Sequence, residues 1–279
     1  MNYRLFFCVI ITFSAINLTN AQGNLKCGTH VKSMNPSFQK MLQTPANECN
    51  YILQARKKFQ ITAHIASDSL QPPITSLAQI NEAIAVLNAA FEPNDMSFEV
   101  CEENNMADFH FYEWNQADDQ AYAFIYHYIP NTINIYFVST VETIDDGEVG
   151  GYAFFPGGPE AIVVAVDDDG TVPVTTVVHE MGHFFGLFHT FETDFGVENI
   201  SQDNCATAGD LICDTEADPQ GSVDDECTYE SPLGNGDDFY TPPIDNWMSY
   251  YTSCACRFTI QQYNQMTENY LNSNRFNLW

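Results

Sequence analysis

The sequence predicts an α+β protein in which strands and helices come first and an irregular, cysteine-rich segment follows. Three observations support this: β-rich runs separated by turn residues, helical stretches with one apolar face, and residues 190–245, which are rich in Asp, Gly, Pro and Cys. With 279 residues, 45% of them hydrophobic and 14% aromatic, the chain can bury a sizeable core. A disordered acidic chain is therefore excluded.

The predicted strands come before the middle of the chain or close to it. Residues 59–65 alternate apolar and polar side chains, as expected for a half-buried strand. Three further runs are β-rich and bounded by turn residues: 96–101, 133–138 and 161–166.

Three helices are predicted from their start signals and apolar stripes. Ser76 and Gln79 form a capping box ahead of the first helix. The second helix follows Pro173, a residue favoured at the start of a helix. Thr259 and Gln262 form another capping box, which opens a closing helix.

The charge of the chain is strongly negative and uneven. Nine Lys and Arg residues face 37 Asp and Glu residues, for a formal net charge of −28. This excess excludes nucleic acid and other polyanions as partners and favours cations or basic peptides. No Lys or Arg lies within residues 59–255, whereas residues 56–58 are all basic. We interpret residues 22–58 as a leader that is released at this triplet and residues 59–279 as the main domain. A saline or calcium-rich environment is the alternative explanation of the charge.

The beginning of the chain predicts export. Arg4 precedes an apolar run, and small residues follow at positions 19–21, so we expect a signal peptide over residues 1–21. The apolar run is too short to span a bilayer, which needs ~20 residues, and we expect a secreted chain with no membrane span. Removing this segment leaves an even number of cysteines, which suggests disulfides. These are Cys27, Cys49, Cys101, Cys205, Cys213, Cys227, Cys254 and Cys256.

The residues that carry chemistry lie in the segment 179–189, HEMGHFFGLFH. His179 and His183 are four residues apart, so on a helix they share one face and can bind one zinc ion at ~2.0–2.1 Å each. Gly186 can end the helix with a positive φ and turn the chain so that His189 becomes a third ligand. Glu180 could then reach a zinc-bound water, because three protein ligands leave one position open, as in catalytic zinc sites. Ordinary buried histidines are the weaker alternative.

The extended motif resembles the zinc motif of the metzincin metallopeptidases, and the segment around Met248 resembles their Met-turn. Among metzincins the chain is most similar to the pappalysin family, which includes ulilysin-like enzymes, through residues 189–191, 209–215 and 248–250. The resemblance covers about residues 59–273. It implies a metzincin-type two-lobed zinc peptidase: an upper lobe with a twisted mixed β-sheet and two long helices, and a mostly irregular, disulfide-stapled lower lobe that ends in a C-terminal helix.

The resemblance also implies a zinc-dependent endopeptidase that acts on protein or peptide substrates. Glu180 would be the general base, Tyr250 would stabilise the oxyanion, and Met248 would lie beneath the metal. For Tyr250 a packed aromatic is the alternative. A preference for basic residues at the scissile bond is expected from the family. A catalytically silent protein or a calcium-dependent binding protein on the same fold is the alternative function, and we expect a monomer.

Two further expectations concern cysteines and calcium. In related precursors a leader cysteine resembling Cys27 blocks the metal as a thiolate in a zymogen, while a disulfide is the alternative for this residue. Two disulfides are implied for the lower lobe with their pairing left open, and Cys49 with Cys101 is a candidate upper-lobe bridge.

A structural calcium ion is expected in a stretch that resembles a calcium-binding segment of the family, because carboxylate and carbonyl oxygens suit that cation. The candidate ligands are Asp210, Asp214 and Thr215. Glu216 departs from the family, which usually has proline there.

Overall fold

The computed structural model describes residues 26–42, 55–67, 72–108, 111–224, 226–231 and 240–278. The expected signal peptide and Cys49 lie outside these residues. Within the described ranges, no helix is long and apolar enough to cross a membrane.

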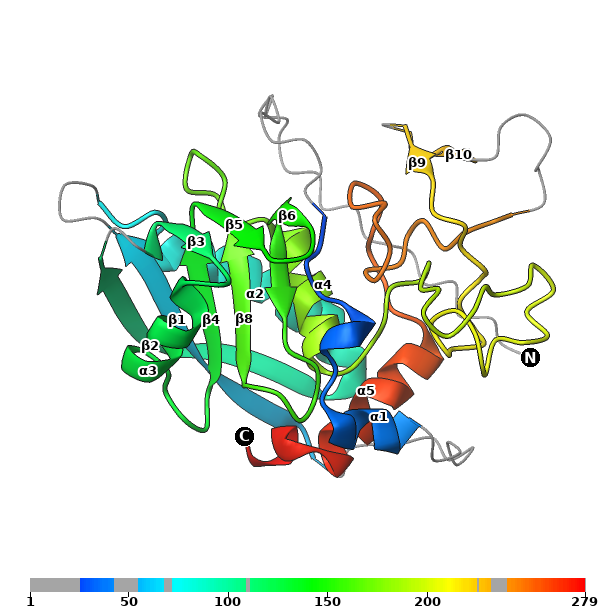
Figure 1. Ribbon diagram of the computed structural model, residues 1–279, viewed down its shortest axis with the longest axis horizontal. Coiled ribbons are helices and arrows are strands. Elements are labelled where there is room, and N and C mark those ends of the chain that lie inside the picture. The colour runs from blue at the N-terminus through cyan, green and yellow to red at the C-terminus, as the bar shows by residue number, and fades with distance from the viewer. Residues whose placement is uncertain are drawn as a thin grey trace.

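Five strands form one mixed sheet (Figure 1). In chain order they are β1 (Lys57–Ser67), β2 (Met96–Ala107), β4 (Ile133–Val138), β7 (Gly151–Ala153) and β8 (Ala161–Ala165). Their order across the sheet is β2-β1-β4-β8-β7. Neighbours pair in parallel except for β7, which runs antiparallel to β8 and forms one edge. A smaller sheet has the order β3-β5-β6, from β3 (Glu113–Asn115), β5 (Thr140–Thr143) and β6 (Gly147–Val149).

Two long helices cover one face of the main sheet, and a short helix lies on the other (Figure 1). The long helices are α2 (Leu77–Phe91), followed by the 3₁₀ turn η2 (Glu92–Asn94), and α4 (Val174–Phe184). Their apolar stripes pack on inward side chains such as Phe59 and Ile135. The opposite face packs on Trp114 and on α3 (Asp119–Tyr126). The expected capping box of Ser76 and Gln79 is present at the start of α2. The predicted upper lobe is confirmed.

The lower lobe is irregular between α4 and α5 (Ile260–Asn272), as the sequence predicted. Two disulfides cross-link it, Cys205–Cys213 and Cys227–Cys254, and Cys256 is disulfide-bonded as well. Its only other regular elements among the described residues are β9 (Ser222–Val223), β10 (Tyr229–Glu230) and the terminal η4 (Asn274–Asn277). The capping box of Thr259 and Gln262 opens α5 as expected.

The expected upper-lobe disulfide through Cys101 is wrong. Cys101 carries a free, exposed thiol. The register of β1 and β2 shifts at this point: Ile61 pairs with Val100 and Thr62 with Glu102, so Cys101 is the extra residue of a β-bulge. A bulge on the edge strand β2 turns the thiol to solvent instead of toward another element.

Residues 26–42, part of the expected leader, lie against the sheet edge, a position that their weak sequence pattern did not predict. Figure 1 shows this segment in blue, between the sheet and the loop-rich lobe. It forms η1 (Val31–Ser33) and α1 (Pro36–Leu42). Its backbone pairs with β7 through a parallel bridge between Cys27 and Gly151, and the Gly28 N–H donates to the Gly151 carbonyl at 2.8 Å. Phe38 of α1 stacks on Phe155, which follows β7.

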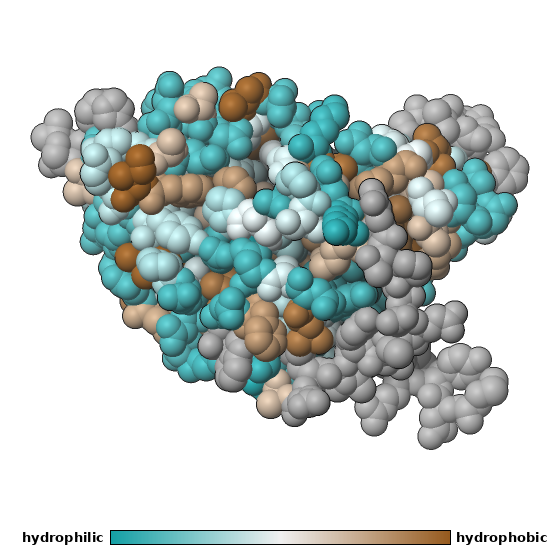
Figure 2. All heavy atoms as spheres, turned by 60° about the horizontal axis from the view of Figure 1, so that its bottom comes forward, coloured by the Kyte–Doolittle hydropathy of each residue, from teal (hydrophilic) through white to brown (hydrophobic). Residues whose placement is uncertain are grey.

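The outer surface is predominantly polar. Figure 2 shows a face of mainly hydrophilic residues in which apolar residues form small, separate spots. Large exposed apolar side chains include Ile125, Ile144 and Val197, which belong to different segments. This surface agrees with the large excess of acidic residues.

Candidate metal centre

The helix α4 and the turn after it bring three histidines together. His179 and His183 lie on α4, and Gly186 follows with a φ of 89°, the left-handed conformation that glycine adopts without strain. A Cβ at Gly186 would lie 2.3 Å from the amide nitrogen of Asn269, so no other side chain fits there. The Asn269 amide donates to the Phe185 carbonyl at 2.9 Å and holds the turn that returns the chain to His189.

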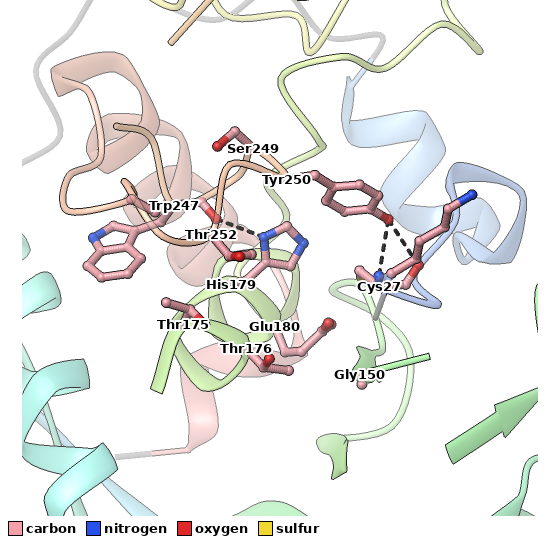
Figure 3. A pocket seen from close by; sticks show the side chains of 13 residues that line it. Cys27, Gly150, Thr175, Thr176, His179, Glu180, Trp247, Ser249, Tyr250 and Thr252 are labelled. Carbon is pink, nitrogen blue, oxygen red and sulfur yellow. Dashed lines mark hydrogen bonds between the residues drawn. The ribbon is translucent and has the colours of Figure 1, made fainter. Parts of the chain in front are cut away.

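The imidazole nitrogens of these histidines converge in a buried position. His183 Nε2 lies 3.1 Å from Nε2 of both His179 and His189. Nδ1 of His179 donates to the Trp247 carbonyl at 2.7 Å (Figure 3), and Nδ1 of His183 donates to the Leu187 carbonyl at 2.7 Å. Each of these two Nδ1 atoms therefore carries the ring proton, and the Nε2 lone pairs face one another.

A metal ion fits this set of donors. Burial lowers the pKa of all three histidines, that of His179 to about 4, so the rings are neutral and available as ligands. Two ligands ~2.0 Å from a tetrahedral zinc ion are separated by roughly 3.3 Å, close to the observed spacing of the nitrogens. Lone pairs that face each other repel unless a cation lies between them.

Glu180 lies beside the histidine cluster and is fully buried. Its Oε2 accepts a hydrogen bond from the Thr29 hydroxyl at 3.0 Å, while Oε1 has no hydrogen-bond partner among the described residues. Burial raises the pKa of Glu180 to about 7, although hydrogen bonds with Cys27 and Thr29 act in the opposite direction. The carboxyl group is therefore able both to accept and to return a proton near neutral pH.

The turn around Met248 completes the floor and one wall of the site. Met248 is fully buried, and a Cβ at Gly182 would lie 2.3 Å from its sulfur, so the methionine packs directly under α4. The Tyr250 ring contacts His189 with centroids 5.0 Å apart. Its hydroxyl donates to the Cys27 carbonyl and accepts from the Cys27 N–H, both at 3.1 Å (Figure 3).

Cys27, which belongs to the expected leader, lies within the same cluster. Its sulfur and one nitrogen from each of the three histidines all lie within 4.8 Å of one another. The residue is buried and is not part of a disulfide. Burial, and then the nearby Glu180, raise the pKa of its thiol. The structure thus brings the leader cysteine, the three histidines and the glutamate of the motif into one group.

The expected calcium ligands do not all face one point. Asp210 is buried and accepts hydrogen bonds from the Ile212 N–H and the Thr215 hydroxyl, each at 3.0 Å. Asp214 instead faces the start of α5, where it accepts from the Thr259 hydroxyl at 2.6 Å and from the Gln261 N–H at 2.9 Å. A carboxylate that contacts the N-terminus of a helix is favoured by the helix dipole.

Sequence reasoning missed two residues near these sites. Thr29 contacts Glu180, and its hydroxyl also accepts from the Ala153 N–H at 2.8 Å. Glu198 is 7% exposed, and neither of its carboxylate oxygens has a hydrogen-bond partner among the described residues. Burial raises the pKa of Glu198 to about 7, and this residue also raises the pKa of Asp210. Neither residue belongs to a recognisable sequence motif. Their importance depends on contacts with other segments of the chain, which the sequence does not display.

Comparisons with known proteins find a matching family model and several similar proteins. The model of the Peptidase M43 family, described as pregnancy-associated plasma protein-A, matches residues 160–271. An extracellular metalloprotease of Pyricularia oryzae is 34% identical over 152 residues, which are 48% of this chain and 47% of the relative. One from Sordaria macrospora is 29% identical over 251 residues, which are 80% of this chain and 78% of the relative. The chain thus spans about half the length of the Pyricularia oryzae relative.

A solved structure supports the fold. The structure described as mirolysin in complex with compound 9 superposes with a TM-score of 0.58 and covers 81% of this chain and 96% of its own. The two sequences are 17% identical, so the likeness shows a shared fold.

Proposed function

We propose that the chain is a member of the pappalysin family of metzincin metallopeptidases, and that it is a secreted, zinc-dependent endopeptidase acting on proteins or peptides. The observation that carries this proposal is the convergence of three buried Nε2 atoms beside a buried glutamate. Extracellular relatives and the disulfides of the lower lobe support secretion.

In this proposal the three histidines would hold a zinc ion, which when bound would act as a Lewis acid and lower the pKa of a water toward ~7. Hydrogen bonds from Nδ1 of His179 and His183 to backbone carbonyls fix the orientation of these two rings. Because the rings are buried, they stay neutral over the pH range in which such an enzyme works.

Glu180 and Tyr250 handle the proton and the developing charge. Glu180 Oε1, which has no partner in the described structure, takes a proton from the attacking water and passes it to the leaving amine. The Tyr250 hydroxyl donates a hydrogen bond to the carbonyl oxygen of the scissile bond as that oxygen becomes negative. Burial raises the pKa of Tyr250 well above its usual value, so the phenol keeps its proton for this role.

The leader is proposed to keep the enzyme inactive as a zymogen. Its Cys27 sulfur lies within 4.8 Å of a nitrogen of each histidine and would hold the metal together with them. The Cys27 backbone engages the Tyr250 hydroxyl, and Thr29 engages Glu180. Cleavage at residues 56–58, followed by departure of the leader, would free all three groups. Lys57 is the first residue of β1, and its N–H donates to the backbone carbonyl of Asp95. Cleavage after Arg56 therefore leaves the whole strand intact.

The latch can be tested on the full-length precursor. We expect Cys27→Ala to cleave a quenched peptide substrate without prior leader removal, because the metal keeps an open position. Cys101→Ala removes the exposed free thiol and serves as the matched control. Equal latency of wild type and Cys27→Ala would show that the thiol does not hold the leader in place.

A calcium ion is proposed as a structural cofactor between Asp210 and Glu198. A Cβ at Gly209 would lie 2.6 Å from Glu198 Oε2, so this carboxylate lies against the residue that precedes Asp210. The Glu198 carboxylate raises the pKa of Asp210, so the two buried groups interact. Two interacting buried carboxylates need a counter-cation or protons, and oxygen ligands suit calcium. The Thr215 hydroxyl donates a hydrogen bond to Asp210 and positions that carboxylate. Asp214 instead accepts a hydrogen bond from Thr259 at the start of α5.

A preference for basic residues beside the scissile bond is expected from the sequence and stays a prediction. The acid excess of the chain is its support.

The experiment that tests the proposed function uses casein. The purified precursor is trimmed with trypsin, which finds no Lys or Arg to cut after within residues 59–255. Trypsin is then blocked with a serine-protease inhibitor. We expect cleavage of casein that a zinc chelator abolishes and added zinc restores. Absence of chelator-sensitive cleavage after trimming would overturn the proposal.

A further inference from the structure

The orientation of His179 depends on a peptide group of the lower lobe. The His179 Nδ1–H donates to the carbonyl of Trp247, which lies 68 positions later in the chain (Figure 3). His183, by contrast, donates to Leu187 in the turn directly after α4. A group that accepts from the far nitrogen of a metal-binding histidine fixes the tautomer and the direction of the ring. Whatever holds the Trp247 carbonyl therefore also holds His179.

The peptide group between Trp247 and Met248 is held from its other side by Asn246. The Met248 N–H donates to Asn246 Oδ1 at 2.9 Å, so the side chain bonds to the backbone two residues further on, as in an Asx turn. This peptide bond is trans, and in a planar trans peptide group the C=O and the N–H point in opposite directions. Fixing the Met248 N–H therefore fixes the direction of the Trp247 carbonyl toward His179.

Gln262, in the first turn of α5, holds the Asn246 amide. Asn246 Nδ2 donates to Gln262 Oε1 at 2.8 Å, and Gln262 Nε2 donates to Asn246 Oδ1 at 3.1 Å. Gln262 Oε1 also accepts from the Thr259 N–H at 2.8 Å, within the capping box of α5. A flipped Asn246 amide would direct its NH2 group at the Met248 N–H and leave buried donors unpaired, which is costly. The reciprocal amide pair thus permits one orientation of Asn246.

Burial and backbone contacts make this arrangement rigid. Asn246 and Gln262 are both 0% exposed. The Trp247 N–H donates to the Arg257 carbonyl at 2.9 Å, and Asn246 forms a parallel bridge with Arg257. The Ser249 hydroxyl donates to the Asn246 carbonyl at 2.8 Å. The turn around Met248 is therefore attached to the segment that leads into α5 as well as packed under α4.

We propose that Asn246 and Gln262 are positioning residues of the metal centre, which fix the ring of His179 through the Trp247 carbonyl. Neither residue supplies a metal-binding atom. The inference rests on the proposed function, because it concerns a zinc ion held by the three histidines. It gives α5 a role besides packing: the start of this helix sets the direction of one ligand that belongs to the opposite lobe.

The test measures zinc affinity of the trimmed protein by competition with a chromophoric chelator, together with the visible spectrum of the cobalt-substituted protein. Asn246→Ala removes the acceptor of the Met248 N–H, and Gln262→Met removes the remote amide but keeps the length of the side chain. We expect each to weaken zinc binding about 10- to 100-fold and to shift the cobalt absorption. Asn246→Ser keeps a hydroxyl acceptor that forms the same turn more weakly, so it should recover part of the affinity lost in Asn246→Ala.

Thr267→Val is the matched control. It removes a buried hydrogen bond of the same helix, from the Thr267 hydroxyl to Asn94 at 2.6 Å. It should lower the melting temperature of the protein while leaving the zinc affinity and the cobalt spectrum unchanged. If Asn246→Ala fails to fold, which a melting curve detects, Gln262→Met decides the outcome against this control.

Wild-type zinc affinity in Gln262→Met and Asn246→Ala would overturn this inference while the peptidase function stands. The same holds if Thr267→Val loses as much affinity as they do, or if Asn246→Ser recovers none. Failure of the trimmed wild-type protein to bind zinc would overturn the proposed function and this inference together.

Discussion

The two lobes contribute to one centre by different physical means. The upper lobe supplies His179, His183 and Glu180 from a single helix that is packed on the sheet by a continuous apolar core. The lower lobe supplies His189 and Tyr250 from irregular chain that disulfides and buried polar contacts hold together. Helical periodicity can therefore place two histidines together locally, whereas the positions of His189 and Tyr250 depend on cross-links and on buried polar contacts between distant residues.

The largest effect is expected from the upper lobe, at Glu180. Glu180→Gln keeps the shape of the side chain but removes the proton acceptor, so kcat should fall by at least about 10²-fold while zinc content is unchanged. Activity on casein and metal analysis of the trimmed enzyme measure the two quantities. Glu82→Gln, an exposed change on α2, is the control. Full activity of Glu180→Gln would refute the role assigned to this carboxylate.

The next effect concerns the junction of the lobes. Gly186→Ala combines a left-handed backbone with a Cβ too close to Asn269 and Phe38, so it should displace His189 and release zinc. Gly147→Ala provides a matched control, because its φ is 73° but no atom lies within 4 Å of the added Cβ. We expect the control to lose about 1 kcal/mol of stability from backbone strain and to retain zinc. Equal zinc content in the two variants would contradict this account of the turn.

The third prediction tests whether disulfides stabilise the lower lobe but not the upper lobe. Removing Cys227–Cys254 by Cys→Ser changes at both positions frees a loop with a sequence separation of 27, and the chain-entropy model gives a loss of about 3–4 kcal/mol. Limited proteolysis should cut the lower lobe before the sheet domain. Cys101→Ser, which removes the free thiol of the upper lobe, should leave the unfolding midpoint unchanged. If the protease degraded both lobes of the disulfide variant at the same time, the disulfide would not stabilise the lower lobe selectively.

The smallest effect concerns the charge of the lower lobe. Burial raises the pKa of Glu198 to about 7 from an unfolded value of ~4.3, so the calcium-free protein should be most stable below pH ~4.3 with respect to this group and lose that contribution as pH rises through 7. Calcium at pH 8 should restore a few degrees of the melting temperature. Glu198→Gln should weaken both the pH dependence of stability and the effect of calcium on the melting temperature. Glu230→Gln, an exposed change in β10, should leave both as in wild type.

Much of the upper lobe could be predicted because its signals are local. Both capping boxes, the strands at residues 133–138 and 161–165, and the left-handed Gly186 follow from short patterns. Strand ends were less predictable: β2 continues to Ala107, beyond the predicted residue 101, because pairing with β1 extends it. Cys101 was misassigned because a bulge, which depends on the partner strand, decides where its side chain points.

The sequence by itself determined the histidine pair and the glutamate, since residues one helical turn apart must share a face. Only the tertiary structure decided which residues from other parts of the chain lie beside them. Thr29 reaches Glu180 across 151 positions, and Cys27 reaches Tyr250 across 223. The pockets that border the histidine cluster likewise combine segments that are distant in the chain. Such contacts depend on how the leader, the sheet edge and the cross-linked lobe pack together, and no local spacing encodes that packing.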